Sequence, residues 1–469
     1  MRSLVWFRGK DLRVGDHGPL HQAREQGEVI PVFVLDPFFF TPENAMHLPN
    51  RMQFLLESLQ ALAGNLQSLG SRLIVVEGRC QDRIPALATQ WRVDQVLAHR
   101  WSEPFGVERD LQVEAELGRQ GIPLRLFEGE TLVPASALRT GNSTPYHVFT
   151  PFARAFQRQV SVGLPLKVPT GLPPVSHTSV VLPGLTEVGL SNNPQILKGG
   201  ELAAQGRLAA FLEDGLRGYR TGRDIMAQQG TSHLSADLHF GTLSVREVWH
   251  AVAQASVPGE DRQCFLNQLL WREFAHHLLV DKPWLTRLPF REAFARFPWQ
   301  RDEAARQAWI QGRTGYPVVD AAARQLLAEG YVHNRARMVA ACFLTKHLLQ
   351  DYRFGEAHYL HWLVDGDWAN NNMGWQWSAG CGVDAQPWFR VFNPTAQGER
   401  FDPEGAYVKR WVPELESLPP KWVHRPWEAP EGLRRGVNYP GPIVDHGMAR
   451  ARFLEVAKAN LAPERPGIS

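Results

Sequence analysis

Thirteen residues from Asp365 to Trp377 hold the densest group of side chains capable of chemistry in this sequence. They run Asp-Gly-Asp-Trp-Ala-Asn-Asn-Asn-Met-Gly-Trp-Gln-Trp, with two carboxylates, three asparagine amides and three indoles. Asp367, Asn371 and Trp375 recur every four residues, so a helix would carry them on one face. This mixture predicts a buried redox-active ring beside electron-donating indoles. A polar helix start followed by core tryptophans is the alternative interpretation.

A second stretch, Gly230 to Ser235, holds small hydroxyl residues ahead of a predicted helix. Hydroxyls and free backbone N–H groups at a helix start bind phosphate, although the same residues serve as ordinary N-caps. Tyr219 and Arg223 lie just upstream and could add a stacking face and a cation.

A third stretch places Gln268, Trp271 and Arg272 on one helical face, at spacings of three and four residues. An amide, a flat indole and a guanidinium suit a flat, hydrogen-bonding ligand such as a base. A buried tryptophan beside a satisfied arginine is the alternative interpretation.

A fourth stretch repeats this geometry with Asn334, Arg337 and Met338. The apolar run Val339–Leu344 that follows favours burial, and a buried arginine needs a carboxylate partner. Asp365 is the candidate for that partner of Arg337. A solvated basic helix face is the alternative.

The elements that must position these residues fall into two classes. Up to about residue 130, short β-branched runs alternate with amphipathic segments, which predicts an α/β domain with a doubly wound parallel sheet. The predicted strands are Ser3–Phe7, Val29–Leu35, Arg72–Glu77, Gln95–His99 and Pro123–Phe127, and the predicted helices are Gln53–Leu69 and Arg109–Arg119. After the first strand stands Arg8-Gly9-Lys10-Asp11 rather than GxGxxG, so the sheet does not resemble a standard dinucleotide binder.

Beyond a proline-rich stretch from Gly163 to Pro194, β-branched runs give way to helical patterns, which predicts an all-α domain. The expected helices are Glu201–Leu216, Val245–Ala255, Arg262–Leu279, Glu303–Gln311, Pro317–Ala328, Asn334–Leu349 and Gly355–Leu363. We therefore expect an α/β domain over 1–130, an extended linker over 131–200 and a helical domain over 201–469.

The composition is that of a globular chain, with 469 residues, 44% of them hydrophobic and 21% charged. Its sixteen tryptophans are enough to supply a core and still leave some for stacking or electron transfer. Fifty Lys+Arg against 48 Asp+Glu neither demand nor exclude nucleic acid. The four cysteines form no CxxC pair, so we expect no metal centre, and the apolar start is too short for a signal peptide or membrane span. A cytoplasmic protein is expected.

In order and spacing, these motifs resemble the DNA photolyase/cryptochrome family over essentially the full length. The resemblance runs through Trp6-Phe7-Arg8, Asp11-Leu12-Arg13, Tyr146 to Phe152, Gly230-Thr231-Ser232, Leu269 to Phe274, Thr314 to Pro317, Val319-Asp320-Ala321, His333-Asn334-Arg335, Asp365-Gly366-Asp367, Trp375-Gln376-Trp377, Phe392-Asn393-Pro394 and Trp411 to Leu415.

The resemblance implies an FAD folded into a U within the helical half. Arg337 and Asp365 would pair beside the isoalloxazine, Asp367 would lie near its polar edge, and Asn371 would face N5. An amide at that place stabilises a reduced, anionic flavin, which a carboxylate would repel. The implied cofactor-binding residues are Tyr219, Thr231, Ser232, His233, Leu234, Ser235, Gln268, Arg272, Asn334, Arg337, Asp365, Gly366, Asp367 and Asn371.

The implied activity is blue-light-driven repair of cyclobutane pyrimidine dimers in ultraviolet-damaged DNA, with the dimer flipped out of the duplex. The implied DNA-binding residues are Arg223, Gln268, Trp271, Asn334, Arg335, Met338, Trp377 and Gln397, with Trp271 and Trp377 sandwiching the two bases. Asn371 and the short chain after Leu415 favour repair over the alternative of a cryptochrome-like photoreceptor. The pair Asn334 and Met338 favours cyclobutane dimers over (6-4) photoproducts. A flavin-free nucleic-acid binder is a third alternative.

Two positions depart from the family pattern and carry their own hypotheses. Gln268 stands where many of these enzymes place a glutamate on the dimer, which predicts a lower repair yield than in a Gln268→Glu variant. The usual photoreduction relay of three tryptophans maps onto Trp375, Tyr352 and Trp299, so electron transfer could slow at the tyrosine or reroute through Trp362 or Trp368.

A second chromophore cannot be assigned from the sequence. Trp101, Glu103, Arg109 and Asp110 lie where some members of the family bind a folate or deazaflavin antenna, but the pattern matches neither type. An ordinary strand end and helix start is the favoured interpretation. We expect a monomer.

Overall fold

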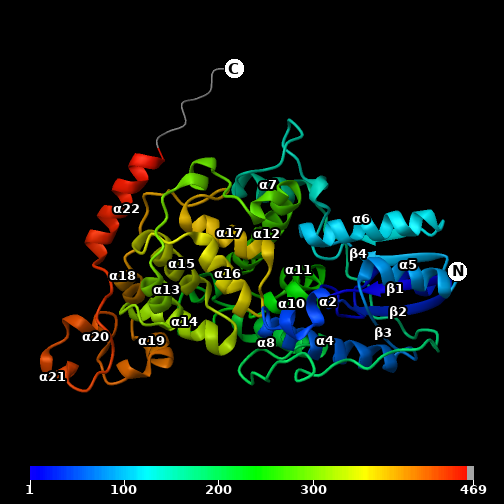
Figure 1. The fold of residues 1–469 in the computed structure, drawn as a ribbon, viewed down its shortest axis with the longest axis horizontal. Helices are drawn as coiled ribbons and strands as arrows, with labels where there is room; N and C mark the ends of the chain where they lie inside the picture. Colours follow the sequence, from blue (N-terminus) through cyan, green and yellow to red (C-terminus); the bar gives the residue numbers. More distant parts are fainter. Residues whose placement is uncertain (462–469) are drawn as a thin grey trace. The chain divides into compact units, whose positions relative to one another are not determined.

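A five-stranded parallel sheet forms the N-terminal part of the computed structural model, which describes residues 1–461. The strands are β1 (Arg2–Phe7), β2 (Glu28–Leu35), β3 (Ile74–Glu77), β4 (Gln95–His99) and β5 (Leu124–Phe127). Their order is β3-β2-β1-β4-β5, and every neighbouring pair is parallel (Figure 1). The predicted sheet is confirmed.

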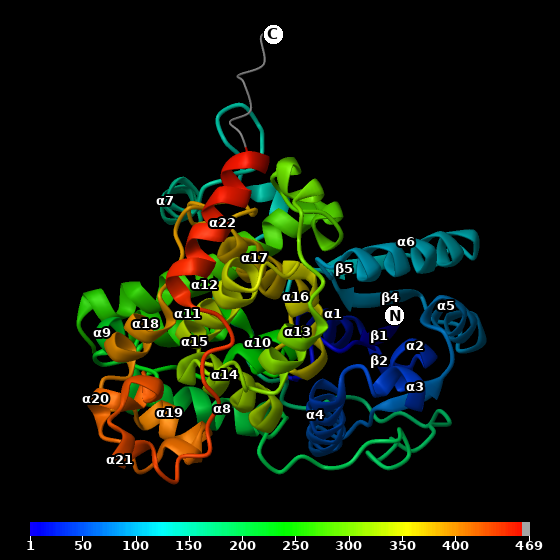
Figure 2. The ribbon, with the colours of Figure 1, turned by 60° about the vertical axis from the view of Figure 1, so that its left-hand side comes forward.

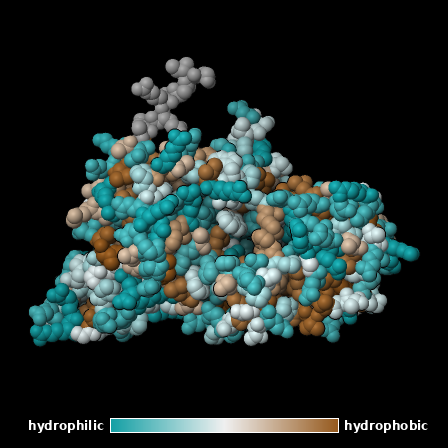
Figure 3. All heavy atoms as spheres, viewed as in Figure 1, coloured by the Kyte–Doolittle hydropathy of each residue, from teal (hydrophilic) through white to brown (hydrophobic). Residues whose placement is uncertain are grey.

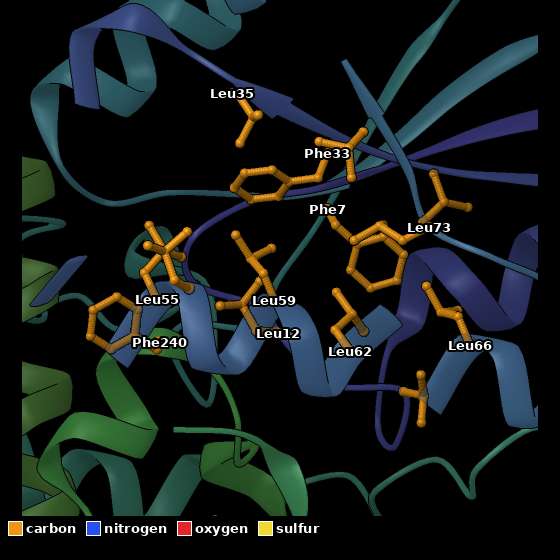
Figure 4. Packing of buried hydrophobic residues seen from close by; sticks show 14 of the residues in the cluster. Phe7, Leu12, Phe33, Leu35, Leu55, Leu59, Leu62, Leu66, Leu73 and Phe240 are labelled. Atoms are coloured by element: carbon orange, nitrogen blue, oxygen red, sulfur yellow. The ribbon is translucent and has the colours of Figure 1, made fainter. Parts of the chain in front are cut away.

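Alternate residues of each strand enter two separate cores, because successive side chains of a strand point to opposite faces. On one face Val5, Phe7 and Phe33 join one apolar cluster, and α4 (Pro49–Ser68) covers it. Figure 4 shows how Leu55, Leu59, Leu62 and Leu66 of α4 point toward the sheet. On the other face a second cluster forms under α5 (Cys80–Gln90) and α6 (Pro104–Arg119). The sheet is therefore doubly wound.

Strand order reverses between β1 and β4, since the chain runs outward from β1 to β3 and returns to β4 on the other side. The carboxyl ends of parallel strands on either side of such a reversal leave a crevice between their loops. The loops after β1, β4 and β5 carry Lys10, Glu103 and Glu130.

The described residues divide into two compact units, each assembled from several stretches of chain. Unit 1 comprises 1–220, 231–283 and 363–369, and unit 2 comprises 221–230, 284–362 and the chain from 370 onward. Besides the helices over the sheet, unit 1 contains α1 (Gly18–Gln26), α2 (Pro37–Phe40), α3 (Pro42–Ala45), α7 (Phe149–Gln159), α8 (Glu201–Ala210), α10 (Ser235–Phe240), α11 (Val245–Gln254) and α12 (Gly259–Asp281).

Unit 2 is helical, as predicted for the C-terminal half. Its helices are α13 (Glu303–Ile310), α14 (Pro317–Glu329), α15 (Asn334–Cys342), α16 (Tyr352–Trp362), α18 (Pro394–Phe401), α19 (Ala406–Trp411), α20 (Pro420–Val423), α21 (Glu431–Arg434) and α22 (His446–Asn460). The buried helix α14 packs against α13, α15, α16, α18 and α19 (Figure 2). Two helices, α9 (Tyr219–Gly222) and α17 (Trp368–Ala379), begin in unit 1 and end in unit 2.

Three local features differ from the sequence-based expectation. The segment 131–200, predicted as an extended linker, contains the helix α7, whose buried face carries Phe152 and Phe156. Two predicted helices end in π-helical turns, Phe211–Gly215 after α8 and Phe343–His347 after α15. Hydrophobic spacing alone does not distinguish these wider turns from an α-helix.

The molecular surface is mainly polar, with apolar residues scattered among hydrophilic ones on the face seen in Figure 3. Over residues 1–461, no helix combines the length and apolar character that a membrane crossing requires.

Candidate functional site

Asp367, at the centre of the predicted site, belongs to unit 1 and is buried. Its Oδ2 atom lies 3.5 Å from His239 Nδ1, 3.6 Å from His276 Nε2 and 3.7 Å from Lys10 Nζ. Burial opposes ionisation, but His276, His239 and Lys10 outweigh it and hold the pKa of Asp367 well below its usual range. The carboxylate is thus an anionic hydrogen-bond acceptor.

The hydroxyl residues predicted to bind phosphate also lie in unit 1. Thr231 and Ser232 are half-buried, Ser235 is exposed, and His233 adopts a positive φ of 52°. Ser235 begins the short helix α10. Upstream, the ring of Tyr219 is buried edge-on against Phe265, with centroids 5.2 Å apart.

Helix α12 brings Gln268, Trp271 and Arg272 together as predicted. The Trp271 indole stacks on Phe149, with ring centroids 3.8 Å apart and 7° between the planes. A base could therefore stack only on the opposite face of this indole. Arg272 is buried and donates to the carbonyls of Glu130 and Leu238, so its guanidinium ties α12 to the loop after β5.

In unit 2, Asn371 lies on α17, one helical turn before the buried Trp375. Its Nδ2 donates to the backbone carbonyl of Glu356 at 3.1 Å, which fixes the orientation of the amide. The Glu356 carboxyl is itself buried, and its Oε1 accepts from Asn372 Nδ2 at 2.8 Å. Burial raises the pKa of Glu356 to about 7. Sequence reasoning missed this residue, because nothing in the pattern of α16 marks it as buried.

Helix α15 carries Asn334, Arg337 and Met338 in unit 2. Asn334 is exposed, and its Nδ2 lies 3.8 Å from Met338 Sδ, which confirms that these two side chains share a face. Arg337 donates to the carbonyl of Val332 at 2.7 Å. Because Asp365 belongs to unit 1, the predicted ion pair of Arg337 stays a prediction.

The residues predicted near DNA in unit 2 come from several separate segments. Arg335 Nη2 lies 2.7 Å from Asp224 Oδ1, and its guanidinium sits 4.2 Å from the centre of the Phe401 ring. These contacts bring together three segments: the start of α15, the 221–230 segment that carries Arg223, and the end of α18. Gln397 also lies on α18. Trp377 on α17 is half-buried. Arg335 already has a protein carboxylate as partner.

The three predicted relay residues all lie in unit 2. Trp375 and Tyr352 are buried and Trp299 is half-buried. The ring contacts of Trp375 within this unit are edge-on to Tyr359, at 5.1 Å between centroids, and to Trp309, at 6.0 Å. Sequence reasoning missed both, since neither residue belongs to the family motifs.

Tyr352 is poorly placed to lose a proton. Its hydroxyl is buried and has no hydrogen-bond partner among residues 1–461, and burial raises its pKa. At the outer end of the predicted relay, Trp299 lines a cavity of about 480 Å³ together with Arg301, Arg306 and Arg353.

The residues considered for an antenna chromophore contact one another in unit 1. Trp101 is buried, with the guanidinium of Arg109 at 4.5 Å and that of Arg8 at 5.6 Å from its ring. Asp110 forms an ion pair with Arg8 at 2.6 Å. These side chains form a charged cluster between β1, β4 and α6, and their interpretation as an ordinary strand end and helix start stays a prediction.

Comparison with known proteins agrees with this arrangement. Residues 3–173 match the family model described as DNA photolyase, and residues 265–459 match the model described as FAD binding domain of DNA photolyase. Among curated proteins, the chain is 40% identical to a deoxyribodipyrimidine photo-lyase of Agrobacterium fabrum, covering 96% of both. It is 36% identical to that of Escherichia coli, covering 97% of this chain and 98% of the relative.

Solved structures give the same result. A bacterial class III photolyase from Agrobacterium tumefaciens has a TM-score of 0.93 and 38% identity, covering 98% of both chains. A cryptochrome from Synechocystis has a TM-score of 0.89 and 30% identity, covering 97% of this chain and 99% of the other. An α/β sheet half followed by a helical flavin-binding half defines the class. The chain belongs to the DNA photolyase family.

The residues present fit FAD, the cofactor that the matched domain binds. Asp367 offers a buried anionic acceptor for a ring N–H, and Thr231 and Ser232 offer hydroxyls that suit phosphate oxygens. Asn371 offers a neutral amide with a fixed orientation.

Proposed function

We propose that this protein repairs cyclobutane pyrimidine dimers in DNA by light-driven electron transfer. When bound, reduced FAD would supply the photochemistry, and the protein would supply placement and exclude water. The relatives named deoxyribodipyrimidine photo-lyase, which this chain matches over nearly its full length, support this assignment.

Asn371 is the observation that carries the proposal. Its amide donates to the backbone carbonyl of Glu356 on α16. Asn371 itself lies on α17 with Trp375 and Trp377, so one helix combines a neutral amide with two indoles. A neutral amide tolerates negative charge beside it, whereas a carboxylate at this position would repel a reduced anionic ring.

The remaining predicted residues would bind the damaged strand. Trp271 has one face covered by Phe149, so a flipped base would stack on its other face, worth about 1 to 3 kcal/mol per base. Asn334 and Met338 share a face and would contact the damaged strand. Arg223, Arg335 and Gln397 would lie near the phosphates, with Arg335 exchanging or sharing Asp224.

The test is a repair assay on the purified, FAD-loaded protein. Oligonucleotides that carry either a cyclobutane dimer or a (6-4) photoproduct are illuminated with the reduced enzyme, and the restored bases are quantified. We expect dimer repair, no (6-4) repair, and loss of repair in Trp271→Ala with FAD still bound. The exposed Trp284→Ala serves as a matched tryptophan control and should repair normally.

Other outcomes would assign the other candidate functions. Repair of (6-4) photoproducts alone would make the protein a (6-4) photolyase. Photoreduction without repair of either lesion would favour a photoreceptor. The similarity to a Synechocystis cryptochrome is the observation that supports this alternative. A protein that takes up no FAD on reconstitution would contradict the proposal. We also propose that the protein acts as a cytoplasmic monomer, which sedimentation and fractionation would test.

A further inference from the structure

Lys10 lies at the centre of a buried group of charges in unit 1 that the family assignment does not explain. Its ammonium lies 2.9 Å from Glu103 Oε1, contacts Glu130 Oε1, and lies 3.7 Å from Asp367 Oδ2. All four side chains are buried. An ammonium surrounded in this way is far more strongly held than a surface lysine, because water does not screen the attraction.

The sheet topology explains how the group forms. Lys10, Glu103 and Glu130 follow the carboxyl ends of β1, β4 and β5, on either side of the reversal in strand order. The backbone around Lys10 is fixed by α10 and the turn that follows it. Leu12 N donates to Phe240 O at 3.2 Å, and a Cβ on Gly241 would lie 2.0 Å from Lys10 O. Only glycine fits there.

A second connection reaches Asp367 through a hydroxyl and an imidazole. Ser102 Oγ lies 2.6 Å from Glu130 Oε2 and 2.7 Å from His276 Nδ1, and His276 Nε2 lies 3.6 Å from Asp367 Oδ2. Lys10 and His276 lower the pKa of Glu130 to about 2 against the effect of burial, so Glu130 accepts the hydroxyl proton. His276 Nδ1 is within hydrogen-bond distance of the Ser102 hydroxyl, and the opposite ring nitrogen faces the Asp367 carboxylate.

The whole group is balanced in charge. Lys10, Arg51 and Arg272 supply three cations against the three carboxylates of Glu103, Glu130 and Asp367, while His239 and His276 supply the imidazoles. Arg51 contacts the residue before Asp367, because its Nη1 donates to the carbonyl of Gly366 at 3.3 Å. The three closest nitrogens, of Lys10, His239 and His276, lie against one and the same oxygen of Asp367.

We propose that Lys10 is a positioning residue for the flavin: its ammonium attracts Oδ2 of the Asp367 carboxylate across 3.7 Å and keeps that group ionised. The inference rests on the proposed function, because Asp367 is assigned to the polar edge of the isoalloxazine there. It adds that a residue in the first loop of the sheet sets the charge that the ring experiences.

Removing the ammonium leaves three carboxylates without their shared cation, and one of them must then take up a proton near neutral pH. We expect the visible absorption band of FAD bound to Lys10→Met to shift with pH between about 5 and 8. Lys10→Arg should keep the pH profile of the wild type, and the additional titration is read as the difference between Lys10→Met and the wild type. Loss of packing alone would not create a titration.

A charge-compensated double variant keeps the test decisive if Lys10→Met folds poorly. Lys10→Met with Glu103→Gln removes one cation and one anion, so we expect it to regain most of the FAD content that Lys10→Met loses and to show a smaller pH shift. A matched control is Lys346→Met, which removes another buried lysine, one that donates to Arg390 O in unit 2. It should keep the pH profile of the wild type.

The outcomes separate this inference from the proposed function. A Lys10→Met holoprotein whose spectrum follows the wild-type pH profile would overturn the role of Lys10 while leaving FAD binding intact. The role of Lys10 is also overturned if Lys10→Met loses FAD and the double variant does not recover it. Failure of the wild type to bind FAD would instead contradict the proposed function.

Discussion

At the scale of single residues, Gln268 is where this chain departs most clearly from its relatives' expected chemistry. Its Nε2 donates to the carbonyl of Cys264 on its own helix at 3.3 Å, so part of its donor capacity is already used. A protonated glutamate at this position can donate to a dimer carbonyl and supply a proton that compensates the charge of the dimer radical anion, whereas glutamine cannot supply that proton.

Gln268→Glu should therefore raise the repair yield per absorbed photon above that of the wild type. The measurement is the quantum yield on a dimer-containing oligonucleotide, with Gln263→Glu on the exposed face of α12 as the control. Equal or lower yield in the Gln268→Glu variant would count against the role assigned to this side chain.

Glu356 provides a second prediction for a single residue. Its pKa is about 7 when folded against an ordinary value of 4.5, so the folded state holds the proton more tightly than the unfolded state. Its stabilising effect is complete below about pH 4.5 and disappears as pH rises through 7. Glu356→Gln keeps an acceptor for Asn372 and removes this dependence.

From pH 5 to pH 8, the free energy of unfolding of Glu356→Gln should rise relative to wild type by roughly 1 to 3 kcal/mol. Urea titrations at several pH values measure this difference. The exposed Glu416→Gln should run parallel to wild type throughout. A Glu356→Gln variant that also runs parallel would mean that the carboxyl is ionised in the folded protein.

At the scale of elements, α16 and α17 pack so closely that a glycine is needed between them. A Cβ added to Gly355 would lie 2.1 Å from Trp375 Cη2 and 2.6 Å from Leu344 Cδ2. Gly355→Ala should therefore displace the indole and destabilise the protein by about 1 to 3 kcal/mol through overpacking.

Gly374→Ala on α17 is the matched control, because no atom lies within 4 Å of the added methyl group. It should stabilise by up to about 1 kcal/mol, since alanine is the better helix former. Thermal unfolding compares the two. Equal effects at both glycines would contradict the close packing of α16 on the Trp375 ring.

The same two helices, with α13, determine how electrons could reach Trp375. Trp309 on α13 is buried, donates its Nε1–H to Ala340 O at 3.2 Å and lies edge-on to Trp375. Tyr352 has no acceptor within residues 1–461 for the proton that an oxidised tyrosine must lose. Within unit 2, these contacts favour an indole route through Trp309.

We predict that Trp309→Phe slows light-driven flavin reduction several-fold and that Tyr352→Phe leaves it nearly unchanged. Absorbance changes under blue light with an external electron donor measure the rate, and chemical reduction by dithionite checks that the cofactor is intact in each variant. Slower reduction in Tyr352→Phe alone would restore the tyrosine to the relay. A rate that neither substitution changes would point instead to Trp362 or Trp368.

At the scale of the whole molecule, the sequence predicted the elements far better than the contacts between them. Short β-branched runs and proline-rich breaks locate the sheet and the helical half, because these signals are local. The Lys10 group was not predictable, since its members are adjacent only once β1, β4 and β5 are ordered in the sheet. The carboxyl-end rule for parallel strands could have indicated the loops after β4 and β5.

For the candidate site, too, the sequence predicted the residues that share a helix face but not the contacts between distant segments. Motif spacing placed Gln268 and Trp271, and Asn334 and Met338, on shared faces, and the structure agrees. It did not predict that Phe149 covers one face of Trp271 or that Arg335 is already paired with Asp224. Those contacts come from residues distant in sequence, and the domain division at 130 and 200 stays a prediction.

The chain crosses between the two compact units at 220, 230, 283, 362 and 369. The short segment 363–369 returns Asp367 to the unit that contains Lys10, although the two residues are far apart in the sequence. A hybrid gene spliced from two homologous parents at any point between these two positions would therefore inherit the ammonium from one parent and its carboxylate from the other. Descent by recombination should keep these two positions matched, so that they change together or not at all.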